Sequence, residues 1–122
     1  MTAENCEVYQ TKYAGVYVNN EGSEISLMNC KVHDIPDNSG LCAEDKGNLT
    51  AKFCEVYQTK NAGVFIKGVE TIVELQSCVI HHSECGIGIE STDRGSVPNI
   101  STVTFGEGIS TKVKKPGLFT RK

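Results

Sequence analysis

Short alternations of apolar and polar residues recur along this chain at a constant spacing. Four cysteines lie at intervals of 24 residues, at Cys6, Cys30, Cys54 and Cys78. A β-branched residue stands two positions after each of them, at Val8, Val32, Val56 and Ile80. Alternation with a period of two residues is typical of a strand, whose successive side chains point to opposite faces. The pattern therefore predicts one short strand after each cysteine.

Two further apolar segments complete each 24-residue unit. One follows a glycine, and the four glycines are Gly15, Gly40, Gly63 and Gly86. The other precedes the cysteine, as Ile25 and Leu27, Leu49 and Ala51, and Val73 and Leu75. Gly, Asn, Asp and Ser separate the segments, as they do between strands. No window shows the 3.6-residue apolar period of a helix, so each unit is predicted to hold three short strands and little or no helix.

Three strands in every 24 residues, repeated without helices, exclude a βαβ fold. They fit a coil in which each strand lies over its counterpart in the next turn, about 4.8 Å away, and neighbouring turns bury the core by stacking. We therefore predict an all-β fold, a right-handed parallel β-helix of about four to five turns with three short strands in each. One domain is expected over 1–111, with regular turns over 5–90 and a degenerate last turn or cap over 91–111.

This repeat resembles the parallel β-helix repeats of pectate-lyase-like proteins, including the domain class called carbohydrate-binding and sugar-hydrolase. It is especially similar to eukaryotic β-helix repeat proteins of the F-box and Shc-binding type. The resemblance covers residues 5–90. It implies the fold, whereas the activities of the class vary: its members include lyases, hydrolases, epimerases, phage spikes and noncatalytic interaction modules.

The charged residues are unevenly distributed. Of the 12 basic and 15 acidic side chains, five basic and no acidic ones lie in residues 112–122. This basic C-terminal tail is interpreted either as a solvated, flexible end or as a contact for an acidic partner or a membrane surface. The formal net charge of −3 gives no argument for nucleic-acid binding. No apolar stretch reaches the ~20 residues that span a bilayer, so no membrane span is expected.

The four regularly spaced cysteines are expected to point inward and form a ladder of thiols along the coil axis. Parallel Cβ vectors give poor geometry for a disulfide, and a free cysteine is a small, well-buried apolar residue. A structural ladder is therefore favoured over a metal or redox role, with Cys42 and Cys85 as further packing residues. Reduced thiols favour a cytoplasmic, reducing setting.

The outward positions of the strands that follow the cysteines carry the candidate binding residues. One column consists of Tyr9, His33, Tyr57 and His81, and it is flanked by Gln10, Asp34 and Gln58. This column is either a binding face, for a sugar or as a protein hot spot, or a stack of side chains that favours strand register.

A second outward column contains charged residues, and His82 flanks the first column. Glu7, Lys31 and Glu55 are expected to stack with alternating charge between turns, which favours register. His81 and His82 are adjacent in the sequence and are expected on opposite sides of a strand unless a turn intervenes. The charged column is therefore interpreted as structural.

Catalysis has little support in these columns. A polysaccharide lyase of this fold needs clustered carboxylates for calcium and a nearby basic residue, and the nearest candidates are Asp34, Asp37, Glu44 and Asp45. His33 and His81 lie two turns apart, roughly 10 Å by strand spacing, and cannot share a metal directly. We therefore expect no metal site and no cofactor, and we favour a noncatalytic protein.

Two functions remain. The first is a noncatalytic protein-interaction or scaffold module that uses a face of the β-helix or its open ends. Nothing before Asn5 could cap the first turn, and a solenoid needs covered ends, so we expect a longer solenoid, a partner protein or self-association. The alternative is a carbohydrate-binding module or a fragment of a lyase-like or hydrolase-like polysaccharide-active protein, which rests on the resemblance and on the Tyr/His column.

Overall fold

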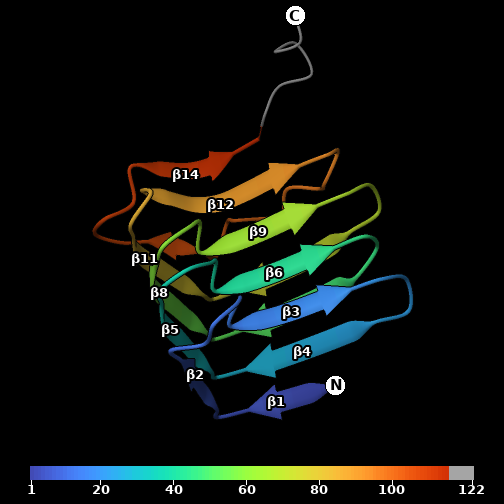
Figure 1. Ribbon diagram of the computed structural model, residues 1–122, viewed down its shortest axis with the longest axis horizontal. Helices are drawn as coiled ribbons and strands as arrows, with labels where there is room; N and C mark the ends of the chain where they lie inside the picture. Colours follow the sequence, from blue (N-terminus) through green and yellow to red (C-terminus); the bar gives the residue numbers. More distant parts are fainter. Residues whose placement is uncertain (116–122) are drawn as a thin grey trace, which may run out of the picture.

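The computed structural model describes residues 1–115, which coil into a solenoid with three parallel sheets (Figure 1). Sheet A contains β1 (Thr2–Glu4), β4 (Glu24–Met28), β7 (Asn48–Lys52) and β10 (Ile72–Gln76). Sheet B contains β2 (Glu7–Tyr9), β5 (Lys31–Ile35), β8 (Glu55–Thr59), β11 (Val79–Ser83) and β13 (Thr104–Phe105). Sheet C contains β3 (Val16–Asn19), β6 (Leu41–Glu44), β9 (Val64–Lys67), β12 (Ile87–Thr92) and β14 (Thr111–Lys114). The predicted all-β solenoid with three strands in each turn is confirmed.

Successive strands of sheet A, and β2, β5, β8 and β11 of sheet B, pair in parallel at the 24-residue spacing that the sequence predicts, as in the pairs Ser26–Thr50 and Lys31–Glu55. Sheet C departs from this spacing, because Val64 pairs with Ile89 and not with Ile87. The fourth member of the glycine column is therefore Gly88, and the assignment of Gly86 to it was wrong. A slip of two residues keeps every side chain on the same face, so the alternation alone does not distinguish the two registers.

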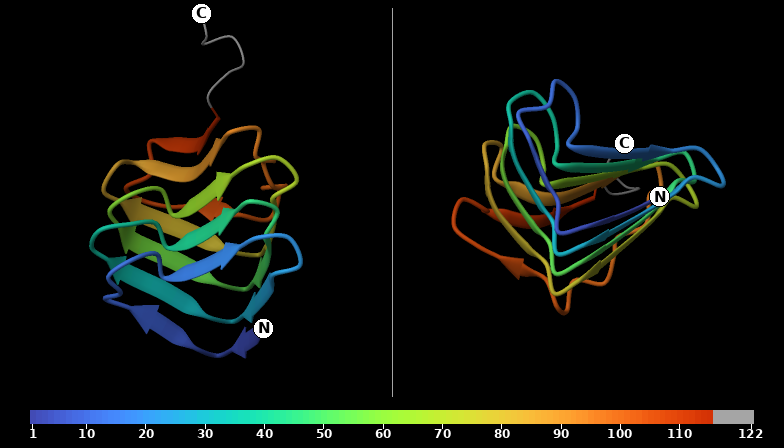
Figure 2. Two further views of the ribbon diagram at one scale, coloured as in Figure 1. Left: turned by 45° about the vertical axis from the view of Figure 1, so that its right-hand side comes forward. Right: turned by 90° about the horizontal axis from the view of Figure 1, so that it is seen from below.

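The core is a single column of apolar side chains inside the three sheets, and the end-on view in Figure 2 shows the sheets around this common interior. Each sheet contributes its inward positions, and Val32, Leu49 and Ile66 are all fully buried. Because a turn is one strand thick, these side chains find their neighbours mainly in the turns above and below. Burial of a side chain of this size stabilises the fold by about 1.5–3 kcal/mol relative to exposure.

The glycine before each strand of sheet C is required by a close approach between turns. A Cβ atom at Gly63 would lie 2.6 Å from the Cγ2 of Ile80 and 3.1 Å from the carbonyl oxygen of Gly88. At Gly40 the same atom would lie 2.5 Å from the Cγ1 of Val56. The glycines thus leave space for the β-branched residues of sheet B in the following turn.

The chain after β12 completes a further, less regular turn. Strands β13 and β14 pair with β11 and β12, and no strand of the described residues follows β10 in sheet A. Strand β14 covers the first part of the predicted basic tail, and Val113 packs against the core. Residues 112–114 are thus part of the solenoid because their alternation buries one side, and residues 116–122 of the tail lie outside the described residues. The described part of the chain has no helix of the length and apolar character needed to cross a membrane.

The close approach at Gly63 predicts a large effect of a single methyl group. Gly63→Ala should lower the free energy of unfolding by about 1–3 kcal/mol, because both atoms that the new Cβ would meet belong to buried, well-packed residues. Denaturant unfolding followed by circular dichroism measures this change. The control is Asn61→Ala at an exposed neighbouring position, which should change stability by less than about 0.5 kcal/mol. Equal stability of the two variants would contradict the close packing.

Candidate functional site

The side chains of Tyr9, His33, Tyr57 and His81 form one continuous stack of rings on the outer face of sheet B. Their ring centroids are 5.3, 4.8 and 4.8 Å apart in chain order, with interplanar angles of 11°, 6° and 5°. In-register pairing of β2, β5, β8 and β11 places the rings one above the other. We call these four residues the ring stack. Each such contact is worth about 0.5–1.5 kcal/mol beyond area burial, so the ring stack holds neighbouring turns together.

Carboxylates of the preceding turn bind both imidazoles of the ring stack. The Oε2 of Glu7 lies 2.5 Å from the Nε2 of His33, and the Oε2 of Glu55 lies 2.6 Å from the Nε2 of His81. Glu7, Lys31 and Glu55 stand in register on successive turns, as the sequence predicts, but Lys31 makes no ion pair with any described residue. The imidazoles are flat, adjacent and partly covered, so they offer the carboxylates a better-fixed partner than a flexible lysine.

His33 is held between two carboxylates. Its Nε2 contacts Glu7 and its Nδ1 lies 2.6 Å from the Oδ2 of Asp34. Burial lowers the pKa of His33, but the hydrogen bonds to Asp34 and Glu7 outweigh it and raise the pKa above the ordinary value of 6.5. With an acceptor at each ring nitrogen, the geometry fits the doubly protonated, positively charged imidazolium.

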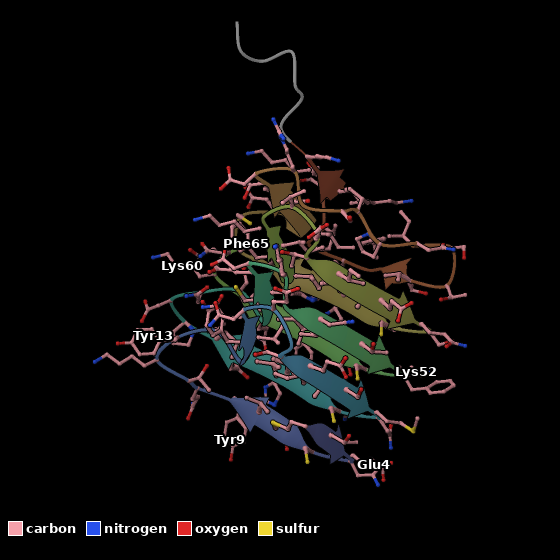
Figure 3. All side chains as sticks on the ribbon, turned by 90° about the vertical axis from the view of Figure 1, so that its right-hand side faces the viewer. Glu4, Tyr9, Tyr13, Lys52, Lys60 and Phe65 are labelled. Atoms are coloured by element: carbon pink, nitrogen blue, oxygen red, sulfur yellow. The ribbon has the colours of Figure 1, made fainter. Side chains whose placement is uncertain are left out.

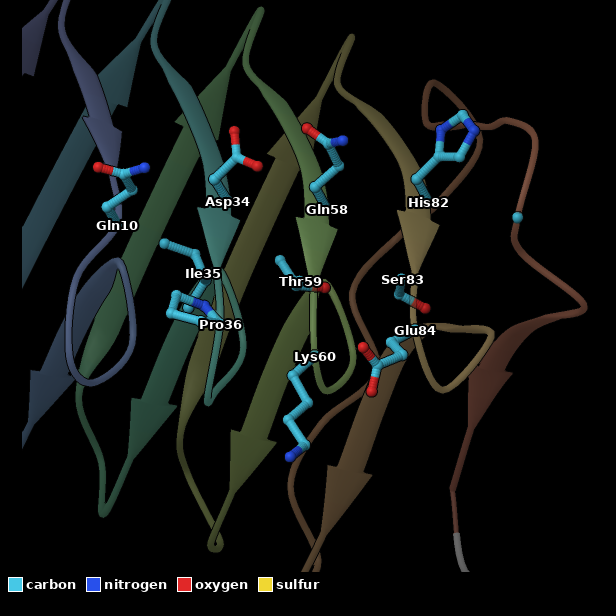
Figure 4. Close-up of a pocket in the computed structure, with 11 residues that line it drawn as sticks. Gln10, Asp34, Ile35, Pro36, Gln58, Thr59, Lys60, His82, Ser83 and Glu84 are labelled. Atoms are coloured by element: carbon cyan, nitrogen blue, oxygen red, sulfur yellow. The ribbon is translucent and has the colours of Figure 1, made fainter.

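One residue at or near the end of each regular strand of sheet B has a left-handed backbone conformation. The residues are Gln10, Asp34, Gln58 and His82, with φ angles of 55°, 53°, 54° and 54°. The positive φ of His82 interrupts the alternation of the strand and places its ring beside that of His81, with their Nδ1 atoms 2.6 Å apart and their rings at 79°. Because this conformation recurs at the same point in four successive turns of the coil, the four side chains line up along the coil axis (Figure 4).

These four side chains line one wall of an open groove of about 540 Å³ beside the ring stack. Two further charged side chains of the groove, Lys60 and Glu84, come from the loops after β8 and β11 and were not predicted from the sequence. Their spacing of 24 residues is the signal that could have found them. The structure thus brings the flanking residues of the predicted binding face together with a lysine and a glutamate.

Three of the four regularly spaced cysteines are buried. Cys30, Cys54 and Cys78 are each 2% exposed and free, whereas Cys6 is exposed because its turn has a neighbour on one side only. A hydrogen bond with the Cys78 thiol and burial raise the pKa of Cys54. Burial also raises the pKa of Cys42 to about 12. A buried thiol with a raised pKa holds its proton and is a poor nucleophile.

The described residues contain no group of three or more His, Cys, Asp or Glu side chains that could hold a metal ion. The carboxylates of Asp34, Asp37, Glu44 and Asp45 therefore do not form the clustered calcium site that lyases of the resembled class require. Asp34 instead binds His33, and Glu44 accepts a hydrogen bond of 3.0 Å from the hydroxyl of Tyr17.

The charge of His33 predicts a pH-dependent contribution to stability. Because its folded-state pKa is raised, this contribution is fully present below the unfolded-state pKa of 6.5 and is lost as pH rises through the folded-state pKa. Asp34→Asn replaces the carboxylate at Nδ1 with a neutral amide and should lower the pKa of His33, which an NMR titration of the ring protons measures. Thermal unfolding at about pH 6 and about pH 8 should show a smaller pH effect in this variant than in the original chain.

The matched control is Asp37→Asn, which makes the same charge change at an exposed position that forms no hydrogen bond or ion pair with His33. It should leave the titration of His33 unchanged. An equal shift in both variants would mean that net charge, and not the hydrogen bond from His33 to Asp34, sets the pKa.

Comparison with known proteins agrees with this architecture. A family model described as right handed beta helix region matches residues 1–112, which include β1–β13 and the beginning of β14. The comparisons with curated proteins and with solved structures gave no match. The matched segment covers most of the chain, and its three parallel sheets coil as the family description states. The chain therefore belongs to the family of right-handed β-helix regions.

Proposed function

We propose that this chain is a noncatalytic interaction module that binds an extended protein segment in the groove beside the ring stack. The observation that carries the proposal is a set of polar groove side chains, from the first and third turns, that are free to bind a ligand. The side chains of Gln10, Gln58 and Lys60 line the groove and make no hydrogen bond or ion pair with another described residue. Amide groups of this kind can pair with the N–H and C=O groups of an extended peptide.

The groove also carries charges of both signs. Asp34 and Glu84 contribute carboxylates, and Lys60 contributes an ammonium group. In Figure 4 these side chains surround the same open space. A segment bound there could be selected by its own charged residues, since complementary charges contribute specificity and like charges exclude partners.

The geometry of the rings favours a peptide over a sugar. A sugar stacks on the face of an aromatic ring, but the faces of His33 and Tyr57 are covered by their neighbours in the ring stack. Only ring edges of these two residues point outward. The alternative, carbohydrate binding, is favoured by one observation: Tyr9 is 52% exposed and stacks on a described ring on one side only.

A variant of the groove tests the proposal. Gln58→Ala combined with Lys60→Ala removes two uncommitted groups, and Gln76→Ala combined with Lys67→Ala removes the same residue types from exposed positions on sheets A and C. Random-peptide arrays and glycan arrays are probed with the original chain and both double variants. We expect specific peptide binding that weakens by about tenfold or more in the groove variant, a loss of about 1.4 kcal/mol, and is unchanged in the control.

Three results would overturn the proposal. These are the absence of specific peptide binding, equal losses in the two variants, and specific glycan binding lost on Tyr9→Ala, which would establish the carbohydrate-binding alternative. All substituted residues are exposed, so the variants should fold as the original chain does, which circular dichroism checks.

A further inference from the structure

Phe53 occupies a backbone position that disfavours large side chains. It lies at the corner between sheets A and B, where one residue per turn has a left-handed conformation. The φ angles are 55° at Asn5, 56° at Asn29, 55° at Phe53 and 54° at Ser77. Among the described non-glycine residues with positive φ, Phe53 is the single apolar one. Asparagine tolerates this conformation, whereas a bulky residue is strained in it by about 1–2 kcal/mol.

The chain contains its own comparison for this position. Residues 6–12 and 54–60 have the same sequence, Cys-Glu-Val-Tyr-Gln-Thr-Lys, and in both copies the strand of sheet B begins at the glutamate after the corner. The residue just before this block is Asn5 in one copy and Phe53 in the other. The side-chain amide of Asn29 donates a hydrogen bond of 2.6 Å to the Oδ1 of Asn5 in the turn before it. The side chain of Phe53, in the turn after Asn29, has no polar group to make an equivalent bond. The fold therefore does not require a phenylalanine at position 53. Backbone strain that is retained at one residue is typical of a functional site, which is a reason to look for a function of Phe53.

The surroundings of Phe53 define what it could bind. Its side chain is 58% exposed, and Met28 and Val79 on the neighbouring turns are 41% and 37% exposed. Phe53 and Val79 line the same shallow hollow of about 320 Å³. We call Met28, Phe53 and Val79 the Phe53 patch. Such a cluster of exposed apolar side chains is typical of a contact surface.

Two lysines and the carboxylate of Glu55 lie beside the Phe53 patch. Lys31 lines the same hollow as Phe53, and Lys52 precedes Phe53 in the chain. Neither lysine has an ion-pair partner among the described residues. The glutamates on either side of Lys31 are bound to histidines of the ring stack, through Glu7–His33 and Glu55–His81. Glu55 lines the hollow with Lys31, and its contact with His81 holds its carboxylate at the ring stack and leaves the ammonium group of Lys31 available to a partner.

We propose that the Phe53 patch is a second docking surface, for a protein segment that carries carboxylates next to an apolar pocket or apolar side chains. Phe53 inserts into the apolar part of the partner, and Lys31 and Lys52 pair with its carboxylates. This surface is separate from the groove, because it lies where the strands of sheet B begin and the groove lies where these strands end. Figure 3 places Lys52 and Lys60, which mark the two surfaces, on opposite sides of the molecule.

The first measurement separates this role from a structural one. Phe53→Asn restores the residue type of the duplicate turn and should raise the thermal unfolding midpoint by about 4 °C, because it removes the strain. A lowered midpoint would show that Phe53 serves the fold and would overturn the proposal. Tyr13→Asn, at an aromatic residue that is 70% exposed outside the Phe53 patch, is the control for loss of an exposed ring.

The second measurement uses a phage-displayed library of random peptides. Peptides that bind the Phe53→Asn variant are removed first, and peptides that bind the original chain are then selected from the remainder. Selected peptides should be rich in Asp and Glu around apolar residues. Their affinity, measured by calorimetry, should fall about tenfold or more in Phe53→Asn and in the double variant Lys31→Ala, Lys52→Ala. Phe53→Leu should retain part of the affinity, and Tyr13→Asn and the groove variant should retain all of it.

Failure of this second surface is distinguishable from failure of the groove, since each has its own variant. A selection that yields no peptide specific for the original chain would overturn the proposal, as would peptides whose binding is insensitive to Lys31 and Lys52. A dimer in sedimentation experiments that dissociates on Phe53→Asn would also overturn it, because the occupant would then be a second copy of the chain.

Discussion

Neighbouring turns of this protein depend on one another for almost every stabilising contact. A single turn is one strand thick, so the N–H and C=O groups of its strands find partners only in the turns above and below. The inward side chains are in the same situation, and Val32, Val56 and Ile80 are buried against equivalent residues of adjacent turns. In-register stacking is therefore the condition for both hydrogen bonding and apolar burial, and it explains why residue types repeat in columns.

The same stacking shapes the outer surface. Rings that repeat at one outward position lie face to face at about the spacing of strands, and they form the ring stack. Their faces then contact one another and not a ligand. The offset between Glu7 and His33 allows a carboxylate of one turn to bind an imidazole of the next. The ring stack is thus a structural element with a fixed charge pattern, and the uncommitted polar groups lie beside it, in the groove.

The corners of the coil are where the repeat allows variation. Each corner needs a left-handed residue, whose side chain points away from the core and is free of the packing constraint. Polar residues such as Gln58 and His82 at one corner line the groove, and Phe53 at the other corner stands out among polar neighbours. Function in a short β-helix can therefore reside in the corners, since residues there change without disturbing the stack.

The sequence by itself determined the solenoid, its 24-residue turn, the three strands in each turn and the inward and outward sides of sheets A and B. It could do so because a period of two sets the face of each side chain and a constant spacing sets the register. The tertiary structure alone decided the register of sheet C, since a slip of two residues leaves the faces unchanged and the loop before β12 takes up the difference. It also decided that Glu7 binds His33 and not Lys31, and that Lys60 and Glu84 join Asp34 in one groove. These features depend on left-handed turns, loop paths and side-chain torsions, which the alternation of apolar and polar residues does not encode.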